Sequence, residues 1–190
     1  MPPFTFVTAP IEEEPDYVVF TDGGTVTATG SSAAAVVIRE PSCAQVWKRR
    51  GIEGRDYPSD RQTVHSRYYP ASTNNVSQYL AFIAALRICI RCKRKTVIIT
   101  DAMIIVHHLT GTQQCRNPHL KPLVAEMKEL YGTCAGYVTI AHMRREDHNP
   151  AEEFVKSARN AALGQGDQNI FNDAPAIRRR QVERHVPIHA

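Results

Sequence analysis

Two short apolar segments, each followed by an aspartate, constrain the fold of this chain most. Tyr17–Thr21 (YVVFT) precedes Asp22-Gly23-Gly24, and Thr96–Thr100 (TVIIT) precedes Asp101. Runs of β-branched and aromatic residues of this length predict buried strands, and the Asp-Gly-Gly sequence predicts a turn after the first. Because the carboxyl ends of neighbouring strands in an open α/β sheet meet at one crevice, we expect Asp22 and Asp101 to lie close together.

The remaining segments predict a mixed sheet flanked by helices, which is an α/β fold. The segment from about Val76 to Cys92 is apolar on most sides, so it is expected to be a helix buried against the sheet. The expected strands are 17–21, 33–39, 96–100 and 137–141, with either 43–48 or the segment around 67–69 as a further strand. The other expected helices are 102–109, 119–131 and 149–163.

The 190 residues are long enough for one domain with additional segments at both ends. We expect the domain to span residues 17–163, after an acidic, proline-rich arm at 1–16 and before a basic tail at 164–190. Residues 49–70 are polar and contain glycine and proline, so they are expected to be an insertion or a long loop. The insertion and the tails are candidates for contacts with a protein or ribonucleoprotein partner.

The charge distribution points to a polyanionic partner. The chain has 23 Lys and Arg against 19 Asp and Glu, a net charge of +4, and residues 61–100 contain seven basic residues and no acid. An acid-free basic segment favours nucleic-acid binding, although a solvated basic surface would have the same composition. The sequence has no run of about 18 apolar residues, so no membrane-spanning helix is expected.

The cysteines indicate an intracellular protein with reduced thiols. Five cysteines are present, an odd number without regular spacing, and no signal peptide precedes them. Cys89 and Cys92 have the spacing of a metal or redox pair, but they end an apolar helical segment and no second pair completes a zinc site. We therefore interpret them as core and helix-surface residues. The compartment within the cell stays open.

The two aspartates also suggest a cation. Two neighbouring carboxylates repel each other unless a cation lies between them, and a hard divalent ion such as Mg²⁺ prefers oxygen ligands. The alternative is that Asp22 and Asp101 only end strands and begin turns, which is common for aspartate.

Four sequence blocks carry a resemblance to a known family. They occur in the family order and resemble the signature blocks of the type 1 ribonuclease H family: YVVFTDGG at 17–24, TNNVSQYLAFIAAL at 73–86, VIITDAMIIV at 97–106 and HMRREDHNPAEEFVKSARNA at 142–161. The short gap between the last two blocks is similar to the branch without a basic protrusion. The resemblance implies a five-stranded mixed sheet with helices on both faces. It also implies endonucleolytic hydrolysis of RNA in RNA·DNA hybrids by two Mg²⁺ or Mn²⁺ ions.

Carried over by position, the resemblance implies metal ligands at Asp22, Asp101 and Glu153. The second acid of the family falls on Gln78, whose carbonyl oxygen can contact a cation but carries no charge. This departure predicts weakened catalysis. The alternative is an inactive ribonuclease H-like domain, with one metal ion or none, that serves as a nucleic-acid-binding or assembly component.

Other family positions concern the nucleic acid, either a hybrid or a structured RNA. Asn74 and Asn75 match an asparagine pair that contacts the hybrid in the minor groove, and helix capping is their alternative role. Gly23 and Gly24 leave space for the close approach of a backbone or a phosphate.

The last block contributes a histidine and two arginines. His142 lies near the position of a mobile loop histidine that assists proton transfer or product release, and His148 is a rival for that role. Arg144 and Arg145 are candidate phosphate contacts.

Overall fold

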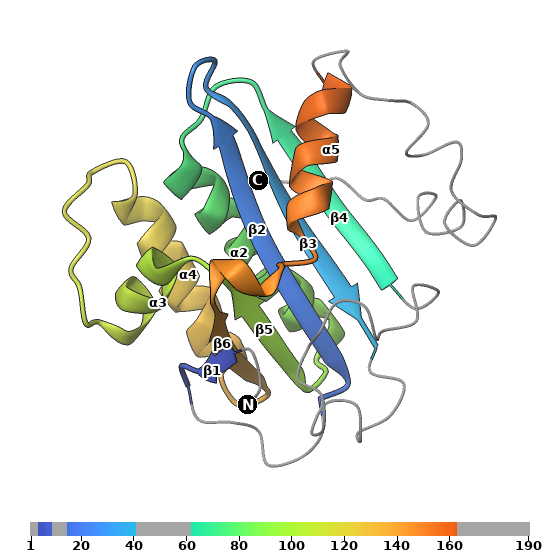
Figure 1. Cartoon of the computed structure of the whole chain (residues 1–190). Coiled ribbons are helices and arrows are strands. Elements are labelled where there is room, and N and C mark those ends of the chain that lie inside the picture. Colours follow the sequence, from blue (N-terminus) through green and yellow to red (C-terminus); the bar gives the residue numbers. More distant parts are fainter. Residues whose placement is uncertain (1–3, 9–14, 41–61, 163–190) are drawn as a thin grey trace.

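The computed structural model describes residues 4–8, 15–40 and 62–162 of the chain (Figure 1). Its sheet has the strand order β1-β6-β5-β2-β3-β4. β5 pairs in parallel with β2 and β6, and the other pairs are antiparallel. The strands are β1 (Phe4–Phe6), β2 (Tyr17–Val26), β3 (Ser31–Arg39), β4 (Gln62–Tyr69), β5 (Thr96–Thr100) and β6 (Val138–Met143). This arrangement confirms the expected mixed α/β sheet.

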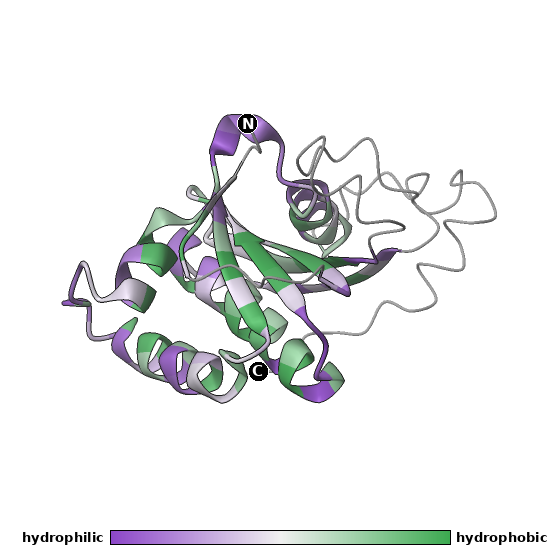
Figure 2. Ribbon diagram, turned by 90° about the horizontal axis from the view of Figure 1, so that it is seen from below, coloured by the Kyte–Doolittle hydropathy of each residue, from purple (hydrophilic) through white to green (hydrophobic). Residues whose placement is uncertain are grey.

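Helices cover both faces of the sheet (Figures 1 and 2). The helices are α2 (Asn74–Cys92), α3 (Met103–Thr110), α4 (Lys121–Cys134) and α5 (Glu152–Ala162), with the 3₁₀ turn η2 (Arg145–Asp147). α2 packs on β2 and β3 from one face and against α4, whereas α5 packs on β3, β4 and β2 from the other. None of the described helices is long and apolar enough to cross a membrane.

Successive side chains of β2 belong to two separate hydrophobic cores, one on each face of the sheet. Val19 packs with α2, whereas Val18 and Phe20 pack with the residues under α5, because successive strand residues point to opposite faces. In Figure 2 the ribbons of the central strands are coloured largely as hydrophobic. Phe82 and Leu86 of α2 are fully buried in the first core, and each such side chain contributes about 1.5–3 kcal/mol.

The ends of α2 are set by specific residues. Thr73 Oγ1 accepts a hydrogen bond of 3.3 Å from the Val76 amide, so Thr73 is the N-cap. At the other end Lys93 adopts the left-handed conformation with φ of 51°, and its amide bonds the Cys89 carbonyl. A capped start fixes the position of the first turn, and with it the polar residues that follow.

The predicted turn at Asp22-Gly23-Gly24 is wrong, because β2 continues through it to Val26. Asp22 pairs with Ala35 and Gly23 with Ala34 of β3, and the chain reverses only after Val26. Packing requires a glycine at position 23, because a Cβ there would stand 2.3 Å from the backbone nitrogen of Gln78. The glycine thus permits close approach of α2 to the strand.

β4 lies within the segment that was expected to be an insertion or loop. Residues 62–69 pair with β3 along their whole length, so the interpretation of 67–69 as strand is confirmed. The other candidate, 43–48, lies outside the described residues, as do 49–61 and the tail from 163 to 190.

β1 is a strand that the sequence analysis did not predict. It lies in the segment expected to be an arm and pairs with β6, with Thr5 opposite His142. Thr8 Oγ1 then accepts a hydrogen bond of 2.9 Å from the Ile140 amide. β1 is therefore the edge strand next to β6.

Candidate active site

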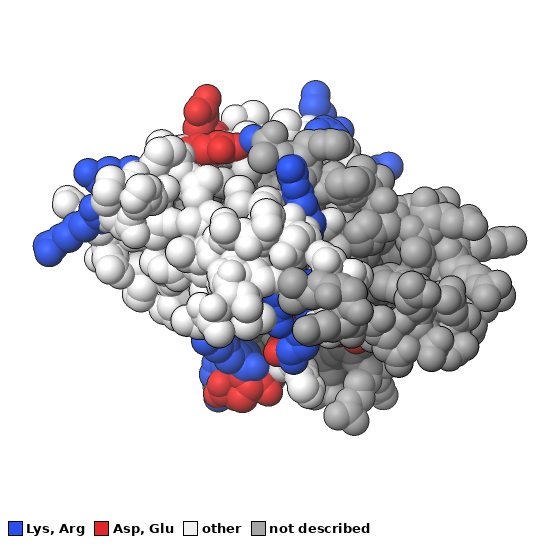
Figure 3. Space-filling view, turned by 90° about the horizontal axis from the view of Figure 1, so that it is seen from above, with Lys and Arg blue, Asp and Glu red and all other residues white. Residues whose placement is uncertain are grey.

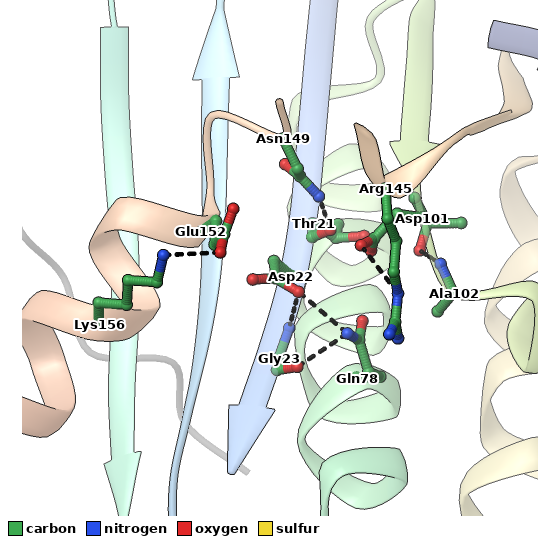
Figure 4. Close-up of polar contacts among 11 residues, drawn as sticks. Thr21, Asp22, Gly23, Gln78, Asp101, Ala102, Arg145, Asn149, Glu152 and Lys156 are labelled. Carbon is green, nitrogen blue, oxygen red and sulfur yellow. Dashed lines mark hydrogen bonds and ion pairs between the residues drawn. The ribbon is translucent and has the colours of Figure 1, made fainter. Parts of the chain in front are cut away.

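The parallel register of β2 and β5 brings Asp22 and Asp101 together. Thr21 of β2 pairs with Thr100 of β5, and Asp22 and Asp101 are the residues that directly follow these two threonines (Figure 4). Asp22 is buried, with 7% of its surface exposed. Burial raises the pKa of Asp22 to about 6, and the Asp101 carboxylate acts in the same direction. The expected proximity of the two carboxylates is thus present.

Gln78 connects α2 to this end of β2. Its side chain is buried, and its Nε2 donates hydrogen bonds to Asp22 Oδ1 at 2.9 Å and to the Gly23 carbonyl at 2.7 Å. The Gly23 amide also donates to Asp22 Oδ1, at 2.8 Å. Since both partners of Gln78 are acceptors, only the amide nitrogen can face them. A glutamate at this position could not make these two bonds.

Asp101 has a different partner. Arg145 Nε of η2 lies 3.7 Å from Asp101 Oδ2 (Figure 4). Burial raises the pKa of Asp101, while Arg145 opposes this effect and His142 opposes it more weakly. His142 pairs with Thr100 across β5 and β6, so its backbone lies beside the residue that precedes Asp101. The last block therefore places the guanidinium of Arg145 beside Asp101.

Asn149 joins the start of α5 to the site, a role that the sequence analysis did not assign. It is buried, and its Nδ2 donates to the Thr21 carbonyl at 2.9 Å. Its Oδ1 accepts from the Ala151 amide at 3.0 Å, as an N-terminal cap does. An asparagine followed by a proline just before a helical pattern is the signal that could have identified it.

The acid of α5 that influences Asp22 is Glu152. Glu152 raises the pKa of Asp22, whereas Glu153, the predicted ligand, is exposed. Ala151 and Val155 are buried, and with 3.6 residues per turn this places Glu153 on the far side of the helix and Glu152 at the boundary. Glu152 Oε1 lies 2.7 Å from Lys156 Nζ (Figure 4). Helical periodicity could have distinguished the two acids.

Three of the candidate nucleic-acid contacts, Asn74, Asn75 and Arg144, have exposed side chains. Because Thr73 caps α2, Asn74 and Asn75 are not needed as the cap, and both are exposed. Arg144 is exposed and its Nε lies 3.1 Å from Asp147 Oδ2. His148 is also exposed and adopts a left-handed conformation with φ of 55°.

The site contains oxygen atoms without partners. Gln78 Oε1 and Asp101 Oδ1 are buried and accept no hydrogen bond, and such atoms are costly unless a cation or water satisfies them. Oxygen atoms of this kind are the donors that a hard divalent ion prefers. Within residues 4–8, 15–40 and 62–162, no three His, Cys, Asp or Glu side chains are grouped so that they could hold a metal.

Comparison with solved structures shows the same fold in ribonucleases H. LC11-RNase H1, isolated from compost by a metagenomic approach, is 24% identical with a TM-score of 0.60 over 79% of this chain and 99% of that chain. The N-terminal RNase H domain of rv2228c from Mycobacterium tuberculosis is 18% identical, with a TM-score of 0.61 over 80% and 98%. LC11-RNase H1 in complex with an RNA/DNA hybrid is 24% identical, with a TM-score of 0.59 over 77% and 99%.

Sequence comparison identifies the family. Curated protein sequences give no match to the chain. The family described as reverse transcriptase-like matches residues 20–158, which include most of β2, both aspartates and most of α5. The chain therefore belongs to the reverse transcriptase-like family and has the ribonuclease H-like fold.

Proposed function

We propose that this chain binds RNA·DNA hybrids through its ribonuclease H-like site and that Gln78 strongly reduces its hydrolytic activity. The family and the fold support the first part, because a ribonuclease H of the same fold has been solved with an RNA/DNA hybrid. The exposed Asn74 and Asn75 supply amides at the start of α2, and amides suit the minor groove because they both donate and accept hydrogen bonds.

The double hydrogen bond of Gln78 carries the second part of the proposal. Nε2 satisfies Asp22 Oδ1 and the Gly23 carbonyl with a neutral group, so the arrangement of the site is kept while one negative charge is missing. Fewer charged ligands weaken divalent-ion binding. Arg145 beside Asp101 also weakens divalent-ion binding, because its positive charge repels a second cation near this carboxylate.

The donor set assigns residues to one divalent ion. Asp22, Asp101 and Gln78 Oε1 would hold it, and when bound it would polarise a phosphate oxygen. The chain's own groups orient the hybrid: Asn74 and Asn75 contact the minor groove, and Arg144 contacts a phosphate. His142 pairs with Thr100, the residue before Asp101, and is the candidate for the role of the family's loop histidine in proton transfer or product release.

The proposal is tested by binding and cleavage assays on one labelled hybrid. Anisotropy at low salt should show binding by the full chain and by the Gln78→Glu and Asp22→Asn variants. With Mg²⁺ or Mn²⁺, Gln78→Glu should cleave the RNA strand about tenfold or more faster than the unaltered chain. Asp22→Asn should not cleave.

Two results would contradict the proposal, and they are distinct. Absence of hybrid binding by the full chain at low salt overturns the binding function. Equal cleavage rates for the unaltered chain and Gln78→Glu, with binding intact, overturn the role of Gln78 and leave hybrid binding in place.

A further inference from the structure

Arg159 of α5 lies on the same face of β2 as the Asp22 side chain. Its Nη1 is 3.0 Å from the position that a Cβ would take at Gly24, so the guanidinium occupies the space above this glycine. Residues two apart on a strand point to the same face and are about 7 Å apart. The positive group of Arg159 therefore stands roughly one strand repeat beyond Asp22.

The other cations near the site have acidic partners. Arg145 pairs with Asp101, and Lys156 pairs with Glu152. Arg159 has no hydrogen bond or ion pair to any described residue, and its Nε is buried without a partner. A guanidinium presents donors in a planar fork that matches a phosphate group, and a buried donor without a partner is costly.

The position of this guanidinium is held by packing. Val155 Cγ1, one turn earlier on α5, also lies 3.0 Å from the virtual Cβ of Gly24. A side chain at position 24 would displace both groups, so the glycine keeps the arginine close to the strand. In the view of Figure 3 the Lys and Arg side chains are spread over the described surface, and acidic side chains gather mainly at two edges. Such a surface favours separate phosphate contacts over one continuous basic patch.

We propose that Arg159 contacts a phosphate of the nucleic-acid strand that passes Asp22, at a subsite formed over Gly24. The inference rests on the proposed binding of a hybrid and adds a residue that the sequence motifs did not include. The structural alternative is that the methylene stem of Arg159 only covers the strand, as long basic side chains often do.

The test compares three variants of the full chain. Arg159→Met keeps an unbranched apolar side chain and removes the charge. Arg159→Lys keeps the charge but lacks the planar guanidinium group. Arg91→Met is the matched control. Arg91 is exposed in the last turn of α2, 13 residues beyond Gln78, or about 20 Å along the helix axis. Each protein is titrated with a labelled hybrid at several salt concentrations, and its melting temperature is measured.

Loss of one phosphate contact has a specific signature. Arg159→Met should bind the hybrid about tenfold more weakly at low salt, and the slope of log K against log salt should fall by about one. Arg159→Lys should recover the slope and part of the affinity. Arg91→Met should change neither by a comparable amount.

The outcomes separate this inference from the proposed function. If the unaltered chain binds the hybrid and Arg159→Met keeps its affinity and salt slope, the Arg159 contact is overturned and hybrid binding stands. Equal losses for Arg159→Met and Arg91→Met also overturn it, because the effect would then be one of net charge. If the unaltered chain binds no hybrid, both proposals fail.

Discussion

The side-chain amide of Gln78 and the carboxylate of Asp22 are joined by a hydrogen bond of 2.9 Å that links α2 to β2. The same amide nitrogen bonds the Gly23 carbonyl, so one neutral side chain holds both the acid and the backbone beside it. The site is thus stabilised by hydrogen bonds from a neutral side chain at the position where the resemblance implies the second acid.

Replacing Gln78 by glutamate should make the stability of the protein depend on metal. Gln78→Glu loses both donated bonds and adds a carboxylate beside Asp22, which should cost about 3 kcal/mol without metal at neutral pH. Millimolar Mg²⁺ should restore much of this loss. Gln78→Met is the control, because it loses the same bonds without adding charge. Melting temperatures of the two variants with and without Mg²⁺ check this, and equal responses to Mg²⁺ would contradict it.

The stability of the folded protein should fall as pH rises through the titration of Asp22. Its pKa is raised from 3.8 to about 6, so the folded state binds the proton more tightly than the unfolded state. Between about pH 4 and 6 the protein therefore loses roughly 3 kcal/mol of stability from this group. Urea unfolding of Asp22→Asn should show the variant gaining stability over the unaltered chain across this window. Glu129→Gln, an exposed change in α4, should show a constant difference.

Adding a single methyl group at position 23 should disrupt the contact between β2 and α2. A Cβ on Gly23 would stand 2.3 Å from both the backbone nitrogen of Gln78 and the backbone carbonyl carbon of Ser77. Because these are backbone atoms, relief requires the helix to move, so Gly23→Ala should destabilise by about 3 kcal/mol or more. Gly132→Ala in α4 meets no atom within 4 Å and should be neutral or stabilising by about 0.5–1 kcal/mol. If urea unfolding finds Gly132→Ala less stable than Gly23→Ala, the close contact between Gly23 and the backbone of α2 is refuted.

The two neighbouring glutamates of α5 should have different effects on Asp22. Removing the charge of Glu152 should lower the pKa of Asp22, because Glu152 raises it in the intact protein. Glu153 is exposed on the far side of the helix, so Glu153→Gln should leave Asp22 unchanged. NMR titration of the Asp22 carboxyl carbon in Glu152→Gln and Glu153→Gln measures this. A larger shift in Glu153→Gln would return the role to the originally predicted residue.

The central part of the fold could be predicted because its strands and its long helix bury nearly continuous apolar runs. β5 is buried at every position, and α2 carries ten buried residues. β4 was harder to recognise, since Gln62, Thr63 and Arg67 interrupt the apolar alternation on a strand that is only half-buried. β1 has only three residues, too few for a periodic pattern, and is defined by its pairing with β6.

The two aspartates could be placed from local sequence because each follows a buried apolar run of the same sheet: Asp101 comes directly after β5, and Asp22 lies within β2 after its apolar first half. The contacts made by Gln78, Asn149 and Arg159 depend on how α2 and α5 dock, which local patterns do not specify. The glycine at 23 illustrates the difficulty: in isolation it indicates a turn, whereas in the fold it permits two backbones to meet. Tertiary packing overrode the local preference.

β1 covers the edge of β6 that other chains could otherwise pair with. It satisfies one side of β6 with three paired residues, and Thr8 bonds the Ile140 amide just beyond them. A chain without residues 4–8 would expose the backbone donors and acceptors of β6 at an open edge, a surface that readily pairs with a strand of another molecule. Shortening the amino terminus should therefore favour self-association and precipitation. The strand edge exposed in this way includes His142, which pairs with Thr5 in the intact protein.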